Sequence, residues 1–84
     1  MTVPSPKDCR FDSERDGVAF TADVAGQPVK CFITTRALED YFPHARTPDE
    51  KVRMVASLTM LTLRARKCVA DGEPVPITFT TRDF

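Results

Sequence analysis

Two stretches of alternating apolar residues, joined by a glycine-containing turn, constrain the fold more than any other feature of the chain. Apolar residues alternate with smaller or polar ones from Val18 to Val24, and a second apolar, β-branched stretch runs from Val29 to Ile33. A period of two residues is typical of a strand with one buried face. Gly26, between the stretches, can adopt the positive φ that a tight turn requires. The pattern predicts a β-hairpin. In its second strand Val29, Cys31 and Ile33 share one face, and Lys30 and Phe32 lie on the other.

Two shorter segments extend the predicted hairpin into a sheet. Cys9–Phe11 has the character of a short edge strand. After Pro74 the chain alternates again over residues 75–81, with Ile77 in a β-branched stretch. Pro76 near the start of that stretch indicates a sheet edge or the entry to a strand. We therefore expect a small antiparallel sheet of three to four strands.

A short helix is predicted directly after the hairpin. Thr34 or Thr35 can cap a helix over residues 37–42 by accepting a hydrogen bond from the backbone of its first turn. Pro43 then stops it, because proline cannot continue a helix.

A long helix is predicted over about residues 48–70. Thr47 has the character of an N-cap, Pro48 suits the first turn, and Glu50 completes a capping box three residues after the cap. Gly72 suits a left-handed helix end. Such a helix would be about 35 Å long at about 1.5 Å per residue.

These elements predict an α+β fold in which one short and one long helix pack on the sheet. The 84 residues are expected to form a single domain, 1–84, of which 1–8 form a flexible N-terminal arm. The residues expected in the core are Phe11, Val18, Phe20, Val29, Cys31, Ile33, Leu38, Phe42, Leu58, Leu61, Ala65, Ile77 and Phe79.

The long helix carries two apolar stripes when its residues are placed at steps of 100°. The expected core stripe contains Met54, Leu58, Leu61, Ala65, Cys68 and Val69. The second stripe contains Val52, Ala56, Thr59, Met60 and Leu63. Two alternatives explain the second stripe. Either the short helix or the N-terminal arm covers it, or it meets its twin in a symmetric dimer or another partner protein.

The charge balance disfavours a nucleic-acid binder, although one local basic patch keeps that alternative open. Twelve Lys and Arg balance twelve Asp and Glu, and the sequence pI is about 6.5. A neutral chain has no bulk attraction for phosphate backbones or anionic lipid. Arg64 and Lys67 lie three residues apart on the predicted helix, with Arg53 about three turns earlier. These three residues are the candidate contacts for an anion or a nucleic acid.

The usual signatures of catalysis and of cofactor binding do not occur in the sequence. The glycines are scattered, and no Walker, G-x-S-x-G or H-E-x-x-H pattern occurs. Cys31 and His44 could form a nucleophile and base pair, yet Cys31 falls on an apolar strand face, where a cysteine is usually inert. Ligand spacing typical of a zinc site is absent. We expect no catalytic residue, no cofactor and no metal.

The sequence predicts a cytoplasmic protein. Its longest nearly apolar stretch, residues 55–63, is shorter than the roughly 20 residues of a membrane span, and the N-terminus lacks the apolar region of a signal peptide. The three cysteines are odd in number and widely spaced, which favours reduced thiols over disulfides.

The whole chain resembles a family of small bacterial proteins, the domain of unknown function 1488. The resemblance rests on the hairpin Val18–Thr34, the segment Ala37–Phe42 and the ending Ile77–Phe84, and covers roughly residues 9–84. It implies an α+β fold with an antiparallel sheet and helices, and a proteobacterial origin. It implies no activity and no catalytic residues.

Three functional hypotheses follow. The leading one is a non-enzymatic protein-binding or regulatory module that uses the second apolar stripe. This module could bind another protein or form a homodimer. The first alternative is a nucleic-acid-associated protein that uses the basic helix patch, and the second is a thiol enzyme that uses Cys31.

Overall fold

The predicted hairpin is the centre of the molecule. The computed structural model describes residues 4–80, in which β2 (Gly17–Val24) and β3 (Gln27–Thr34) pair antiparallel. Ala25 and Gly26 both have positive φ, which gives the turn a twist that matches the twist of the strands. Asp23 Oδ1 accepts a hydrogen bond from the Gly26 N–H at 2.9 Å. The hairpin prediction is confirmed.

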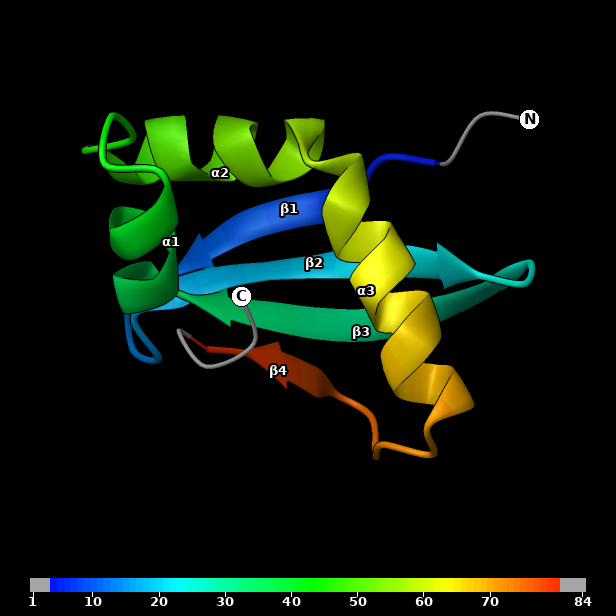
Figure 1. The fold of residues 1–84 in the computed structure, drawn as a ribbon. Helices are drawn as coiled ribbons and strands as arrows, with labels where there is room; N and C mark the ends of the chain where they lie inside the picture. The colour runs from blue at the N-terminus through cyan, green and yellow to red at the C-terminus, as the bar shows by residue number, and fades with distance from the viewer. Residues whose placement is uncertain (1–3, 81–84) are drawn as a thin grey trace.

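Two edge strands complete a four-stranded sheet in the order β1-β2-β3-β4 (Figure 1). β1 (Lys7–Asp12) pairs antiparallel with β2, and its register shifts between Lys7 and Arg10. β4 (Ile77–Phe79) pairs with β3 in the parallel sense. The prediction of an antiparallel sheet is therefore wrong for β4. The helices form a crossover that returns the chain to the start of β3, so the next strand runs in the same direction as β3.

The short helix α1 (Thr35–Tyr41) begins as predicted. Thr34, the first of the two candidate caps, accepts a hydrogen bond from the Ala37 N–H at 3.2 Å. Phe42 is the C-terminal cap, and Pro43 follows it.

The long helix of the prediction is two helices, α2 (Pro48–Ser57) and α3 (Thr59–Ala70). Leu58 separates them with φ of −93° and ψ of 85°. Figure 1 shows α2 running beside β1 and α3 crossing the sheet in another direction. A straight helix of about 35 Å would exceed the longest dimension of the folded molecule, 32 Å. The break lets both halves pack on the sheet.

The ends of the helical region follow the sequence signals. Thr47 accepts a hydrogen bond from the Glu50 N–H at 3.1 Å, and Pro48 occupies the first turn of α2. Beyond α3, Gly72 has φ of 82°, and its N–H donates to the Val69 carbonyl. The predicted start and stop are confirmed, while the interior of the helix is not continuous.

The core lies between the sheet and the helices. Most of the predicted core residues are buried, whereas Phe11, Phe42 and Leu58 are half-buried and pack against the core. Val55 and Thr62 are fully buried as well, although neither belongs to the predicted core stripe. Val55 becomes a core residue because the break at Leu58 changes which face of α2 meets β1.

The segment predicted as a flexible arm lies partly against α3. Thr62 Oγ1 donates a hydrogen bond to the Pro4 carbonyl at 2.8 Å, and Pro6 is buried. Lys7 and Asp8 already belong to β1. Residues 1–3 of the arm, and residue 81 of the predicted last strand, lie outside the described residues.

Candidate functional site

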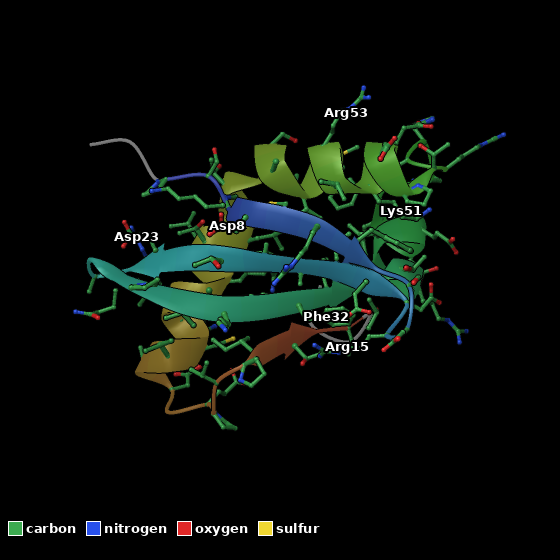
Figure 2. All side chains as sticks on the ribbon, turned by 180° about the vertical axis from the view of Figure 1, so that it is seen from behind. Asp8, Arg15, Asp23, Phe32, Lys51 and Arg53 are labelled. Carbon is green, nitrogen blue, oxygen red and sulfur yellow. The ribbon has the colours of Figure 1, made fainter. Side chains whose placement is uncertain are left out.

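The face of the sheet that points away from the core is the candidate site. In Figure 2, which views the molecule from behind, the strands lie nearest the viewer and the helices lie behind or beside them. Strand alternation assigns side chains to this face, because the buried residues of β2 and β3 at alternate positions, Val18 to Val24 and Val29 to Ile33, point to the other one. We call it the open sheet face. Its central residues are Lys7, Arg10, Ala19, Thr21, Lys30, Phe32 and Thr78, and the same register places Asp12 and Asp23 at its two ends.

The register sets these side chains in two rows across the strands. One row contains Lys7, Thr21 and Lys30, which are cross-strand partners on β1, β2 and β3. The next row contains Arg10, Ala19, Phe32 and Thr78. Neighbouring strands lie about 4.8 Å apart, and neighbouring rows about 7 Å apart. The rows therefore place three cations within a small area of the sheet.

A broad hollow lies over the open sheet face. Its volume is about 960 Å³, and β1, the β1–β2 turn, β2, β3 and Pro76 line it. Among its lining residues, Arg10, Arg15 and Lys30 are cationic, and Asp8, Asp12 and Glu14 are acidic. The floor of the hollow includes Phe32.

Acids and bases differ in where they lie and in what they contact. Asp12 Oδ1, at the end of β1, accepts hydrogen bonds at 3.1 Å from the N–H groups of Glu14 and Arg15. The Asp23 carboxylate is bonded to the hairpin turn in the same manner. Among residues 4–80, no ion pair involves Lys7, Arg10 or Lys30. The basic side chains of the strands therefore remain available to an external anion, whereas two of the nearby carboxylates serve the turns.

Phe32 is covered although it lies on the open side of the sheet. The Arg15 guanidinium lies over the Phe32 ring, with Cζ 4.0 Å from the ring centroid (Figure 2). Beneath the ring lies Gly17, whose Cα leaves no space for a side chain. Phe32 is 4% exposed as a result, and Arg15 is exposed. A cation on an aromatic face is attracted by the ring quadrupole, which favours this position of the guanidinium.

The predicted basic patch is divided between two helices. Arg53 is exposed on α2, whereas Arg64 and Lys67 are exposed on α3, beyond the break. Arg64 and Lys67 stay one turn apart, but the different direction of α2 removes Arg53 from their line. All three belong to the helices rather than to the open sheet face.

The second apolar stripe is divided at the same place. On α2, Val52 packs against the core and Ala56 is exposed. On α3, Thr59 is exposed, Met60 is half-buried and Leu63 is 49% exposed. The structure therefore keeps three of the five residues together on one side of α3.

The thiols and the histidine are placed apart. Cys31 lies in the core, where burial raises the pKa of its thiol from 9.0 to about 11, although a backbone hydrogen bond from Ala22 lowers it in part. Cys9 is half-buried, and its pKa is raised by burial and by the nearby Asp8 carboxylate. His44 is exposed in the loop between α1 and α2. The described residues contain no group of three metal-binding side chains, and no helix among them could span a membrane.

Sequence reasoning did not select the residues of the open sheet face as a site. The alternation along β3 already assigns Lys30 and Phe32 to one face, and this was the available signal. The cross-strand rows, however, depend on the register shift in β1. The position of Arg15 over Phe32 depends on the conformation of the β1–β2 turn.

The comparison with protein families gives one match. A family model described as "Protein of unknown function (DUF1488)" matches residues 6–56, more than half of the chain. The chain belongs to the DUF1488 family. The matched region holds β1 to β3, α1 and nearly all of α2, and therefore every residue of the open sheet face except Thr78. It does not extend to the ending from residue 77 that the sequence resemblance included. No curated protein and no solved structure matches the chain.

Proposed function

We propose that this DUF1488 protein is a non-enzymatic binding module and that the open sheet face binds an anionic ligand. The observation that carries the proposal is the placement of Lys7, Arg10 and Lys30 on a face without helices, where Arg10 and Lys30 also line a hollow of about 960 Å³. Cations on a concave surface raise the local concentration of an anionic partner.

The composition of the open sheet face supports binding rather than catalysis. Its centre combines cations with threonine, alanine and phenylalanine, which offer positive charge, hydroxyl groups and apolar contact, while Asp12 and Asp23 lie at its ends. Of the residues that could act as nucleophile or base, Cys31 is buried in the core, Cys9 lines the hollow but has a raised pKa, and His44 lies in the α1–α2 loop. The raised pKa of Cys31 keeps its thiol protonated at neutral pH, which argues against a thiol enzyme.

The test is a titration of the protein with inorganic polyphosphate at low ionic strength, followed by amide NMR. We expect the shifts to concentrate in β1, β2 and β3, and Lys30→Glu to weaken binding about tenfold or more. Arg53→Glu is the matched control, because it makes the same charge change on an exposed residue of α2. Equal losses in the two variants, or shifts confined to α3, would contradict the proposal.

A second candidate function is protein binding through α3, as a homodimer or with another protein. Leu63 favours it, because this leucine is 49% exposed and lies one turn from Met60 and Thr59. Light scattering over a dilution series tests the dimer. We expect a dimer for the wild type and a monomer for Leu63→Asp, since a buried carboxylate would oppose association. A wild type that is monomeric at every concentration would exclude the homodimer.

We propose that the protein acts in the bacterial cytoplasm. The proposal rests on the three free cysteines and on the family resemblance. Free thiols persist in a reducing compartment. Fractionation of cells that express a tagged chain tests this, and recovery from the periplasm or the medium would contradict it.

A further inference from the structure

One feature of the open sheet face, the contact between Arg15 and Phe32, indicates more about the ligand than that the ligand is anionic. The ring rests on the backbone at Gly17 and carries the Arg15 guanidinium on its outer side. Asp12 holds the same turn, because its carboxylate accepts the Arg15 N–H. The Arg15 guanidinium therefore contacts the ring, and Arg15 is exposed to solvent.

A guanidinium is planar, and one that contacts an aromatic ring while its residue is exposed can stack with another planar group. Proteins that bind single-stranded nucleic acid stack the bases on aromatic rings or on arginine planes, and they contact the backbone with lysine and arginine. Here Phe32 and Arg10 belong to the same cross-strand row, and Lys7 and Lys30 belong to the next. The spacing of about 7 Å between rows places the cations beside the stack rather than beneath it.

We propose that the open sheet face binds single-stranded nucleic acid, with a base stacked on Arg15 and phosphates at Lys7, Arg10 and Lys30. This inference rests on the proposed function, since it names the anionic ligand of the same face. Unpaired bases offer both the planar groups and the charge that the face accommodates. An acidic peptide would satisfy the charges but would leave the guanidinium plane without a stacking partner.

The charge pattern sets the salt dependence. Three phosphate contacts release about three counterions, so the slope of log K against log salt should be about −2 for a single strand. This slope is shallow, in agreement with a chain of net charge zero. Asp8 lines the hollow and opposes the anion, so its removal should strengthen binding.

The experiment measures fluorescence anisotropy of a labelled oligodeoxythymidylate of about ten nucleotides at low salt. An abasic oligomer of equal length and inorganic polyphosphate serve as ligands without bases. Arg15→Lys keeps the charge but removes the plane, and it should weaken oligonucleotide binding about tenfold while leaving polyphosphate binding unchanged. Lys30→Glu should weaken both ligands. Asp8→Asn should strengthen both, and asparagine is tolerated at the positive φ of residue 8.

The outcomes separate this inference from the proposed function. Oligonucleotide binding that Arg15→Lys and Lys30→Glu weaken, and that Arg53→Glu does not, supports both. Equal affinity for the oligonucleotide and its abasic analogue, with no effect of Arg15→Lys, overturns the nucleic-acid inference and leaves anion binding in place. Tighter binding of poly-glutamate than of the oligonucleotide also overturns it, in favour of an acidic protein. No binding of any polyanion at low salt overturns both proposals. A circular dichroism melt of each variant confirms that it is folded.

Discussion

Phe32 shows how a single glycine and a single arginine determine the environment of an aromatic side chain. The ring lies on the side of the sheet that the helices leave open, yet it is only 4% exposed. Gly17 receives one side of it, and Arg15 covers the other. Because an exposed arginine can be displaced or stacked upon, this arrangement keeps an aromatic group available at the surface without a large apolar patch.

Replacing Gly17 by alanine should therefore destabilise the protein. An added Cβ would overlap the Phe32 ring and the Ile33 carbonyl. We expect the free energy of unfolding to fall by about 1–3 kcal/mol, the usual range for overpacking. Urea denaturation measures the change, and an unaltered midpoint would disprove the close approach. The double variant Gly17→Ala/Phe32→Leu should lose less than the sum of the single variants, since the smaller side chain relieves part of the overlap.

Cys31 should make the stability depend on pH in the alkaline range. Its folded pKa of about 11 lies above the ordinary value of 9.0, because burial disfavours the thiolate. The contribution is therefore complete below about pH 9 and is lost as the pH rises through about 11, by about 1–2 kcal/mol. Urea denaturation at several pH values tests this against Cys31→Ala, in which the loss should be smaller over the same range. Identical pH profiles for the two proteins would refute the assignment.

The break between α2 and α3 is the element that most affects the helical surface. Ser57, the last residue of α2, donates a hydrogen bond from its hydroxyl to the Met54 carbonyl at 2.7 Å, which competes with regular helical bonding. Leu58 packs against the core at the break, and its N–H donates to the Val55 carbonyl three residues back. The break therefore combines a weak helix-forming sequence with an apolar residue that the core holds.

Proline at position 59 distinguishes two helices from one. Thr59 is the first residue of α3, a position that proline favours because its missing N–H has no helical partner there. We expect Thr59→Pro to change the free energy of unfolding by less than about 1 kcal/mol. Arg64→Pro, in the middle of α3, is the control and should cost about 3 kcal/mol or more. Equal and large losses in thermal unfolding would indicate a continuous helix.

The last strand of the described residues, β4, completes the core of the molecule. β4 is only three residues long, but Ile77 and Phe79 are buried and Phe79 stacks on Phe20 with ring centroids 6.1 Å apart. Residues from both ends of the chain thus meet in one core. A domain of 84 residues has a free energy of unfolding of only about 4–12 kcal/mol, so this contact is a large part of the total.

Phe79→Ala should therefore come close to unfolding the protein. Removing a buried phenylalanine costs about 3–5 kcal/mol through lost transfer energy and the cavity left behind. Thr78→Ala is the matched control, because Thr78 is exposed on the adjacent position of the same strand. We expect it to change the free energy of unfolding by less than about 0.5 kcal/mol. Similar melting temperatures for the two variants would show that β4 contributes little to the core.

The sequence by itself determined the elements that depend on neighbouring residues. The hairpin, its turn at Gly26, the cap at Thr47 and the stop at Gly72 all follow from alternation, positive φ and the hydrogen bonds of a helix end. The family was also recognisable, from the hairpin, residues 37–42 and the ending at residues 77–84.

Only the tertiary structure decided the features that depend on fitting the elements together. The break at Leu58 lets α2 pack on β1 and α3 on β2, and these contacts join residues that are distant in the sequence. The parallel pairing of β4 follows from the path of the crossover. The open sheet face required the register of β1 on β2, because a shift of one residue would turn Arg10 to the opposite side. Long-range packing thus determines which residues form the candidate site. The local sequence patterns of these residues are those of ordinary strands.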